Sequence, residues 1–412
     1  PKRAGVLFTG TDDGVVSMSR DAGKTWTNVT DRLPGFPRGG WVSEVVPSRF
    51  DAGVAYVTVD AHRLNDYKTY IWATTDSGQT FRSLNNNLRD EVVKTLTEDT
   101  KNANVLYVGT ETGIFVSIDK GASWKRLKAN LPTVRVDEIT IHPRDNAMIV
   151  ATHGRSVWIL DHLEPIQEYA AAQAAGSGAT LFSVPAGMQW RTWDNQNDEF
   201  WGHQFFVGEN PPTDAVIQFH LKQKAGDLKV RITDGTGKEV RLLTVPAARN
   251  APGIQTICWD MRVEPIPAAG AGAGDGGRGG PAGGGAGRAG RGGAGGRGPV
   301  PGVPAPMPDS GSQPSDPCGG GGGGLGFGGG GGNAGPWVMP GSYSVSLMVD
   351  GKVADTKPMR VTLDPAYQMS DAQRRRYYDT AIDLHEMQRR GAEMTTALNQ
   401  LYTQMNDLKG KI

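Results

Sequence analysis

The chain contains the octapeptide Ser19-Arg20-Asp21-Ala22-Gly23-Lys24-Thr25-Trp26, and the same pattern returns twice further along. The second copy is Thr74-Thr75-Asp76-Ser77-Gly78-Gln79-Thr80-Phe81, and the third is Ser117-Ile118-Asp119-Lys120-Gly121-Ala122-Ser123-Trp124. The shared form is Ser/Thr-x-Asp-x-Gly-x-Thr/Ser-aromatic, and successive aspartates are 55 and 43 residues apart. Each copy follows a run of β-forming residues. Units of this length built from short strands are typical of β-propeller blades.

The chemistry of the pattern predicts a tight turn and not a catalytic centre. The Asp side chain can accept backbone N–H groups, and Gly permits a positive φ. The hydroxyl can bond to the nearby backbone, and we expect the aromatic ring to pack between neighbouring sheets. We therefore expect structural roles for Ser19, Asp21, Gly23, Trp26, Thr74, Asp76, Gly78, Phe81, Ser117, Asp119, Gly121 and Trp124.

The strand pattern of residues 1–165 predicts about three and a half blades, a partial propeller. Two complete four-stranded units are expected at 41–84 and 92–127, and a further unit begins at Val136. The first unit has no innermost strand before Val6. Because an incomplete propeller leaves strand edges and sheet faces unpaired, we expect the remaining blades upstream in a longer parent chain or on another chain.

The net charge argues against a nucleic-acid partner, and the hydropathy argues against a transmembrane segment. Lys plus Arg and Asp plus Glu both number 43, so the formal net charge is zero and no nucleic acid partner is expected. No run of about 18 apolar residues is present, so no transmembrane segment is expected. The start of the chain lacks the apolar core of a signal peptide. Since these residues already lie inside a repeat, we expect a trimmed or truncated chain.

The two cysteines, Cys258 and Cys318, do not predict a metal site. Neither lies in a CxxC motif or near a histidine at metal-binding spacing. They can pair in one disulfide, or Cys258 can be buried in its strand, and the sequence leaves both readings open. No cofactor and no metal ion are expected.

Beyond the propeller the chain changes character. A connector is expected over 166–202, with a short Ala-rich helix at Glu164–Ala175. Short alternating strands with turn signals then predict an immunoglobulin-like sandwich over 203–365. Inside it, 268–335 is a Gly-rich insert without bulky apolar residues, which we expect to be disordered.

Residues 366–412 predict a long helix of coiled-coil type. Ser370 and Gln373 form a capping box at its start. Apolar residues then recur in three-four alternation, as in a heptad seam. Three arrangements stay open: a partner helix downstream, pairing with another chain, or packing of the seam on the sandwich. The seam consists of Tyr377, Thr380, Leu384, Met387, Gly391, Met394, Leu398, Leu401, Met405, Leu408 and Ile412.

Four strings resemble a bacterial family of large secreted proteins with sortilin-like BNR (Asp-box) repeats, often catalogued as glycosyl hydrolases. They run from Ala151 to Asp161, Gly208 to Pro212, Cys258 to Arg262 and Pro340 to Val345. The resemblance covers nearly the whole chain outside the Gly-rich insert. It implies the C-terminal part of such a protein, with propeller blades before an immunoglobulin-like domain and a helical segment. It also implies a secreted, periplasmic or cell-surface location. The hydrolase name is inherited from the repeat and implies no catalysis by itself.

Ligand-binding residues are expected on the propeller face opposite the Asp boxes. An Asp box joins the third and fourth strands of a blade, so the loops that join the second strand to the third, and one blade to the next, emerge on the opposite face. Arginine and aromatic side chains there suit a sugar or an acidic peptide. The other reading is that His153 and Arg155 only bond to neighbouring loops. The candidates are Arg38, Trp41, His62, Arg63, Asp66, His153 and Arg155.

A second candidate surface is rich in tryptophan. Its residues suit stacking on carbohydrate, but they equally suit a packed joint between propeller and sandwich. They are Trp190, Trp193, Asp194, Trp201 and His203.

No catalytic residue is assigned, because no arginine cluster with a Tyr/Glu pair and no nucleophile motif can be assembled. The leading hypothesis is a non-catalytic extracytoplasmic binding or assembly module. One alternative is part of a secreted hydrolase, xyloglucanase- or sialidase-like, with its active site mainly in missing blades; an enzyme here would be a glycoside hydrolase. Another is a structural subunit of a cell-surface or filamentous assembly.

Overall fold

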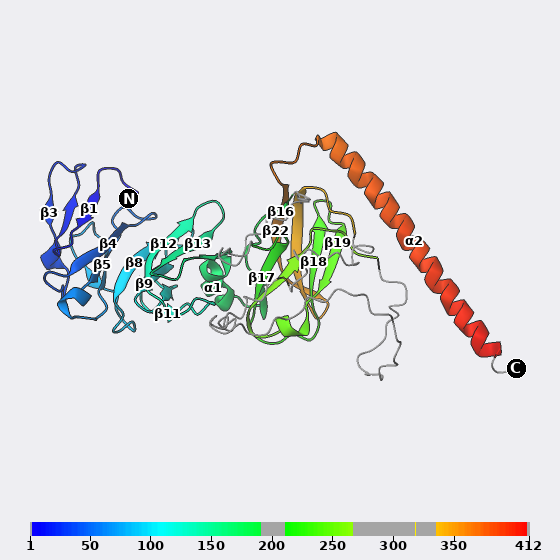
Figure 1. Cartoon of the computed structure of the whole chain (residues 1–412), viewed down its shortest axis with the longest axis horizontal. Coiled ribbons are helices and arrows are strands. Elements are labelled where there is room, and N and C mark those ends of the chain that lie inside the picture. The colour runs from blue at the N-terminus through cyan, green and yellow to red at the C-terminus, as the bar shows by residue number, and fades with distance from the viewer. Residues whose placement is uncertain (1, 191–210, 267–317, 319–334, 410–412) are drawn as a thin grey trace, which may run out of the picture.

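Four small antiparallel sheets follow one another in the computed structural model, which describes residues 2–190, 211–266, 318 and 335–409. The first sheet contains β1 (Leu7–Gly10), β2 (Val16–Ser19) and β3 (Thr27–Asn28). The second contains β4 (Trp41–Pro47), β5 (Ala55–Asp60), β6 (Ile71–Thr74) and β7 (Arg82–Ser83). The third contains β8 (Val93–Glu98), β9 (Leu106–Thr110), β10 (Ile114–Ser117) and β11 (Lys125–Arg126). The fourth contains β12 (Val136–His142), β13 (Ala147–Thr152) and β14 (Val157–Leu160). This order confirms the predicted partial propeller (Figure 1).

Neighbouring sheets are held together by three apolar layers. Val16, Val57 and Trp72 are buried between the first and second sheets. A similar layer around Leu96 joins the second and third sheets, and one around Tyr107 joins the third and fourth. Burying such side chains stabilises the contact by roughly 1.5–3 kcal/mol each, so the stacking of sheets is the main source of stability here.

The third Asp box shows how the turn is built. Asp119 accepts the backbone N–H of Ser123 at 2.8 Å and the Ser123 hydroxyl at 2.6 Å. The N–H of Gly121 donates to the Ser117 hydroxyl at 2.7 Å. Gly121 has a φ of +79°, and a Cβ there would lie 2.9 Å from Leu84 of the preceding blade. The glycine is therefore required twice, for the turn and for the close approach of two blades.

The box aromatics are buried wherever a preceding blade is present. Trp124 is 3% exposed and Phe81 8%, whereas Trp26 of the first sheet is 45% exposed. At the other end, Val157 and Ile159 of β14 are 59% and 63% exposed. Both ends of the stack thus present an apolar sheet face to solvent.

Two further sheets share one core and form a sandwich. One contains β15 (Ala179–Leu181), β17 (Ala215–Leu221) and β20 (Gly253–Trp259). The other contains β16 (Gly187–Gln189), β22 (Lys352–Leu363), β21 (Gly341–Val349), β18 (Leu228–Asp234) and β19 (Glu239–Thr244). The core includes Phe219, Trp259 and Val345 from both sheets. The immunoglobulin-like assignment and the domain boundaries stay predictions.

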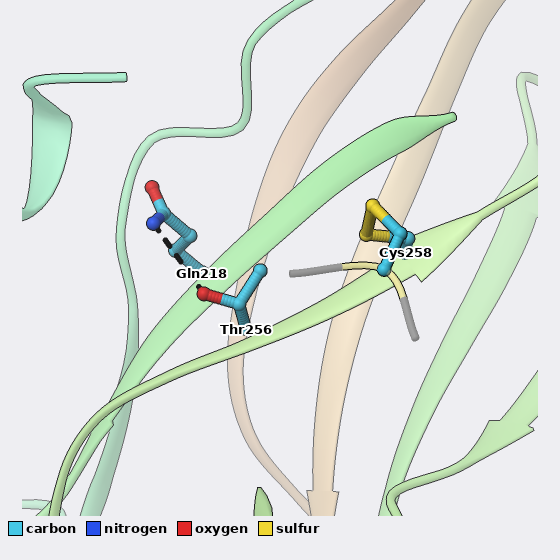
Figure 2. The surroundings of a disulfide bond; sticks show 4 residues. Gln218, Thr256 and Cys258 are labelled. Carbon is cyan, nitrogen blue, oxygen red and sulfur yellow. Dashed lines mark hydrogen bonds between the residues drawn. A yellow bond between two sulfur atoms is a disulfide. The ribbon is translucent and has the colours of Figure 1, made fainter. Parts of the chain in front are cut away.

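The disulfide left open by the sequence is formed between Cys258 and Cys318. Figure 2 shows Cys258 on β20, two residues from Thr256, whose hydroxyl lies 3.5 Å from the Gln218 side-chain amide. Apart from Cys318 and Gly335, the predicted insert lies outside the described residues, as does most of the tryptophan-rich surface. Trp190, the one described tryptophan of that surface, is 48% exposed.

The helices complete the chain. Short helices η1 (Thr30–Arg32), η2 (His62–Leu64) and η3 (Ala247–Arg249) lie in loops. Helix α1 (Glu164–Ala174) follows the fourth sheet, as expected. Helix α2 (Asp371–Lys409) begins at the predicted capping box, where the Gln373 N–H donates to the Ser370 hydroxyl. No helix in the described part of the chain is long and apolar enough to cross a membrane.

The orientation of α2 excludes one of the three arrangements that the sequence left open, in which the apolar seam packs on the sandwich. Its contact with the sandwich is made by another face, where the His385 ring lies 3.0 Å from the carbonyl oxygen of Glu264 and Tyr378 is partly buried. The apolar residues of the seam are exposed instead. The seam therefore does not pack on the sandwich, because the described contacts between them are made by another face of the helix.

Candidate functional site

The innermost strands of three successive blades carry a β-bulge at the same place. The pairing register shifts between Val42 and Glu44 in β4, between Val93 and Thr95 in β8, and between Val136 and Glu138 in β12. The extra residues are Ser43, Lys94 and Asp137. Each bulge lies at the strand end opposite the Asp boxes, because Trp41 at the start of β4 pairs with Asp60 at the end of β5. Bulges at such positions re-aim side chains and are frequent beside functional sites.

Lys94 lies at the centre of a buried ion-pair cluster. Its side chain is 2% exposed, and Nζ contacts Oδ2 of Asp60 at 2.5 Å and Oε1 of Glu111 at 2.7 Å. The Nδ1 atom of His62 lies 2.6 Å from the other oxygen of Asp60. Burial alone would raise the pKa of Asp60, but the hydrogen bonds from Lys94 and His62 outweigh it and hold that pKa below its usual value. Asp60 is therefore a carboxylate at neutral pH.

The same chain of charges continues into the fourth blade. An Arg135 nitrogen lies 4.0 Å from Glu111, and its Nε donates to Asp137 at 2.5 Å. Asp137 in turn lies 3.4 Å from the ring of His153, and the backbone N–H of His153 donates to the carbonyl of Arg135. We call this series the ion-pair chain: His62, Asp60, Lys94, Glu111, Arg135, Asp137 and His153. It connects three blades across one face and ends in a histidine on each side.

The loop between β5 and β6 forms an exposed patch beside the ion-pair chain. The Arg63 guanidinium lies 5.6 Å from the centre of the Trp41 ring, which is a cation–π arrangement. Leu64 is 50% exposed and Tyr67 56% exposed on the same loop. Asp66 holds the loop by accepting the Tyr70 hydroxyl at 2.7 Å. That hydrogen bond lowers the pKa of Asp66, while burial together with Asp66 raises the pKa of Tyr70 to about 12.

The structure brings some of the predicted ligand-binding residues into contact and leaves others apart. Trp41 and Arg63 are in contact, and His62 and His153 belong to the ion-pair chain. Arg38 is exposed and lies 3.4 Å from the equally exposed Asp31. Arg155 is exposed at the turn after β13, where its carbonyl accepts the Trp158 indole. Among the described contacts, neither Arg38 nor Arg155 takes part in the ion-pair chain.

Two glutamates lie directly after the bulges, on the innermost strands. Burial raises the pKa of Glu44, the charge of Glu138 adds to this effect, and the bonds described next oppose it. Burial also raises the pKa of Glu138. Glu44 accepts the Thr95 hydroxyl and the Leu96 N–H, both at 2.7 Å, and so connects the second blade to the third. In the described part of the chain, no group of three or more His, Cys, Asp or Glu is arranged to hold a metal ion.

Sequence reasoning assigned no role to five members of the ion-pair chain: Asp60, Lys94, Glu111, Arg135 and Asp137. A signal for two of them was present in the repeats. Superposing the innermost strands places Ser43, Lys94 and Asp137 in one column, and two of these three residues are charged. Charges at such positions are expected to be paired, because an isolated buried charge is strongly unfavourable.

A family model for sortilin, also called neurotensin receptor 3, matches residues 69–201. The matched stretch begins in the second sheet and includes the third and fourth sheets, so this similarity agrees with the resemblance seen in the sequence. None of the curated proteins matches the chain.

Several solved structures are similar at low identity. The GH74 xyloglucanase from Xanthomonas campestris is 15% identical, with a TM-score of 0.29 over 38% of this chain and 27% of that one. The GH74 enzyme from Niastella koreensis is 14% identical, with a TM-score of 0.31 over 38% and 26% of the two chains. YCF48 bound to D1 peptide is 13% identical, with a TM-score of 0.29 over 60% and 68%. The chain thus spans about a quarter of the two GH74 enzymes, and none of these likenesses indicates its activity.

Proposed function

We propose that this chain is a non-catalytic extracytoplasmic binding module whose propeller fragment captures an acidic peptide. The peptide binds on the face opposite the Asp boxes, at the patch formed by Trp41, Arg63, Leu64 and Tyr67. The observation that carries the proposal is the Arg63–Trp41 stack beside two exposed apolar side chains. Arginine and aromatic anchors of this kind dominate the energetics of protein interfaces.

A peptide fits this patch better than a sugar does. Stacking of a sugar ring needs an open aromatic face, but the Arg63 guanidinium already lies over the Trp41 ring. The same guanidinium can bind a carboxylate in a bidentate manner. Leu64 and Tyr67 then offer apolar contacts to the side chains beside that carboxylate. The exposed Arg155 adds positive charge, whereas the charge of the exposed Arg38 is offset by Asp31 at 3.4 Å.

Further blades are part of the proposal. Trp26 and Leu7 at one end of the stack, and Val157 and Ile159 at the other, are between 39% and 63% exposed. Apolar sheet faces of this kind mark surfaces that another element covers. We propose that blades of the parent protein, or of another chain, pack on both.

An extracytoplasmic location is supported by the disulfide. Cys258 and Cys318 are paired, and such bonds persist in oxidising compartments and are rare in the cytosol. Mass spectrometry of the protein from its native host, with free thiols alkylated before lysis, tests this. A reduced pair in that sample argues against the location.

The binding proposal is tested with two defined probes. A fluorescein-labelled peptide Glu-Leu-Glu-Leu-Glu and a xyloglucan heptasaccharide are titrated against the chain. We expect saturable peptide binding that Arg63→Glu abolishes and that Lys24→Glu, a substitution at an exposed variable position within the first Asp box, leaves intact. Binding of the sugar alone, or peptide binding that is equal in both variants, argues against the proposal.

One observation favours glycoside hydrolysis as a second candidate function. Glu44 and Glu138 both have raised pKa values and lie on the innermost strands, and a general acid in such enzymes needs a raised pKa. Against it, Glu44 uses one oxygen to hold Thr95 and Leu96 in place. Release of reducing sugar from xyloglucan, abolished by Glu138→Gln with unfolding unchanged, is the result that favours the hydrolase over the binding module.

A further inference from the structure

Helix α2 presents a long apolar stripe that the described residues of its chain do not cover. Tyr377, Leu384, Met387, Met394, Leu398, Leu401, Met405 and Leu408 are between 53% and 68% exposed. The helix touches the sandwich on another side, through His385 and the partly buried Tyr378. Charged residues on the remaining surface are engaged locally, since Arg389 pairs with Glu386 and Glu393. A continuous stripe of this kind on a soluble helix marks an interface with another helix.

The stripe is complementary to a reversed copy of itself. Its residues occupy alternating a and d positions of a heptad, and antiparallel helices pair an a position of one with a d position of the other. When α2 is aligned antiparallel to a second α2, every a residue from 377 to 405 meets a d residue. The five kinds of pair are Tyr377 with Leu408, Thr380 with Met405, Leu384 with Leu401, Met387 with Leu398, and Gly391 with Met394.

Gly391 decides between the two orientations. In a parallel pair in register, Gly391 meets Gly391 of the second copy, which leaves a gap in the middle of the seam. In the antiparallel pair it meets Met394, whose flexible side chain fills that space. The room exists, because a Cβ at Gly391 would have no atom within 4 Å. Such small-against-large pairing is how facing layers reach normal packing density.

The flanking residues permit the antiparallel pair. Arg390 lies beside Ala397 of the second copy, and Asp383 lies beside Gln404, so no like charges meet along this part of the seam. An isologous contact requires that one surface fit itself about a two-fold axis, and the seam meets this requirement. We infer that two copies of this chain associate through α2 as an antiparallel coiled coil, with the two-fold axis next to Gly391.

The first test measures the oligomeric state. In light scattering we expect the complete chain to have twice the mass of one copy. Leu398→Asp places a charge in the seam and is expected to abolish the dimer at concentrations where the native chain is dimeric. Asn399→Asp adds the same charge one residue away and is expected to leave the dimer intact. A monomeric native chain, or a dimer that survives Leu398→Asp, overturns the inference.

The second test measures orientation by oxidative cross-linking. Tyr377→Cys and Leu408→Cys are prepared separately and also mixed in equal amounts. An antiparallel pair gives a covalent dimer in the mixture and none with either variant alone, because the two ends are at opposite ends of a 39-residue helix. Covalent dimers from each variant alone show a parallel pair and overturn the proposed arrangement. A mixture that stays uncross-linked although light scattering shows a dimer overturns it as well.

Discussion

Lys94 and Asp60 form an ion pair whose two side chains are almost wholly buried, although they come from different sheets of the propeller fragment. Asp60 ends β5, and Lys94 is the bulged residue of β8. Glu111 contacts the ammonium group as well. Because a buried charge that loses its partner is costly, the two sheets are joined at this point by charges that are tolerated only together.

We predict that Lys94→Met lowers the free energy of unfolding by about 3–5 kcal/mol, since it leaves Asp60 buried without its main partner. Arg38→Met is the matched control, because Arg38 pairs with Asp31 at 3.4 Å and the two side chains are 91% and 90% exposed. Its loss is expected to stay below about 1 kcal/mol. Urea unfolding of the two variants gives both values, and equal losses would contradict the buried pairing.

The two Asp-box tryptophans are expected to differ in energetic importance. Trp124 is 3% exposed and its indole N–H donates to the Leu84 carbonyl at 2.8 Å, so Trp124→Ala is expected to cost about 3–5 kcal/mol. Trp26 occupies the same place in its repeat but is 45% exposed, and Trp26→Ala is expected to cost about 1 kcal/mol or less. Thermal and urea unfolding of this chain provide the comparison. A large loss at Trp26 would mean that its face is already covered in solution, for example by self-association.

Substitutions at Gly121 and Gly154 distinguish the energetic cost of backbone strain from the cost of a clash between blades. Both have a φ of +79°, but a Cβ at Gly121 would lie 2.9 Å from Leu84 while one at Gly154 would have no neighbour within 4 Å. Gly154→Ala is expected to cost about 1–2 kcal/mol for the left-handed conformation alone. Gly121→Ala is expected to cost more, and Leu84→Ala in the same chain is expected to reduce the difference. Equal effects of the two alanines would argue against close blade contact at the box.

The lowered pKa values of the Asp-box carboxylates predict how the free energy of unfolding depends on pH. Hydrogen bonds from Thr80, first from its hydroxyl and then from its N–H, lower the pKa of Asp76 to about 2, against an ordinary value of 3.8. Since the folded-state pKa is depressed, the stabilisation is fully present above about pH 4 and is lost as the pH falls toward 2. Thr80→Val removes the hydroxyl and is expected to raise the folded-state pKa of Asp76, so that the total acid-dependent loss is smaller and is complete at a higher pH. Urea unfolding midpoints between pH 5 and 2 test this, and an unchanged acid limb would contradict it.

The blades were predictable because their determinants are local. Asp76, Gly78 and Thr80 lie within eight residues, so the turn they build can be read directly from their order. The positions of Trp41 and Arg63 on the face opposite the boxes also followed from strand order. Their contact was not predicted, since it depends on the path of the loop between β5 and β6.

The ion-pair chain and the helix orientation were harder to predict. Asp60 and Lys94 are 34 residues apart and meet only because β8 is bulged, and nothing in the residues around Val93 indicates a bulge rather than a regular strand. In α2, the seam and the face around Tyr378 both carry apolar side chains. Periodicity identifies each stripe but does not decide which of them faces the sandwich, because that depends on the shape of the sandwich surface.

The repeated bulges have a consequence for how this fold can diversify. A bulged residue lies outside the regular pairing of its strand, so its side chain can change without altering which residues pair on either side. In three consecutive blades this position holds a hydroxyl, an ammonium group and a carboxylate, at Ser43, Lys94 and Asp137. This face of the propeller fragment therefore carries a different functional group at the same backbone position in each of three blades, and such a group can change without altering the strand register, provided that its charged partners change with it.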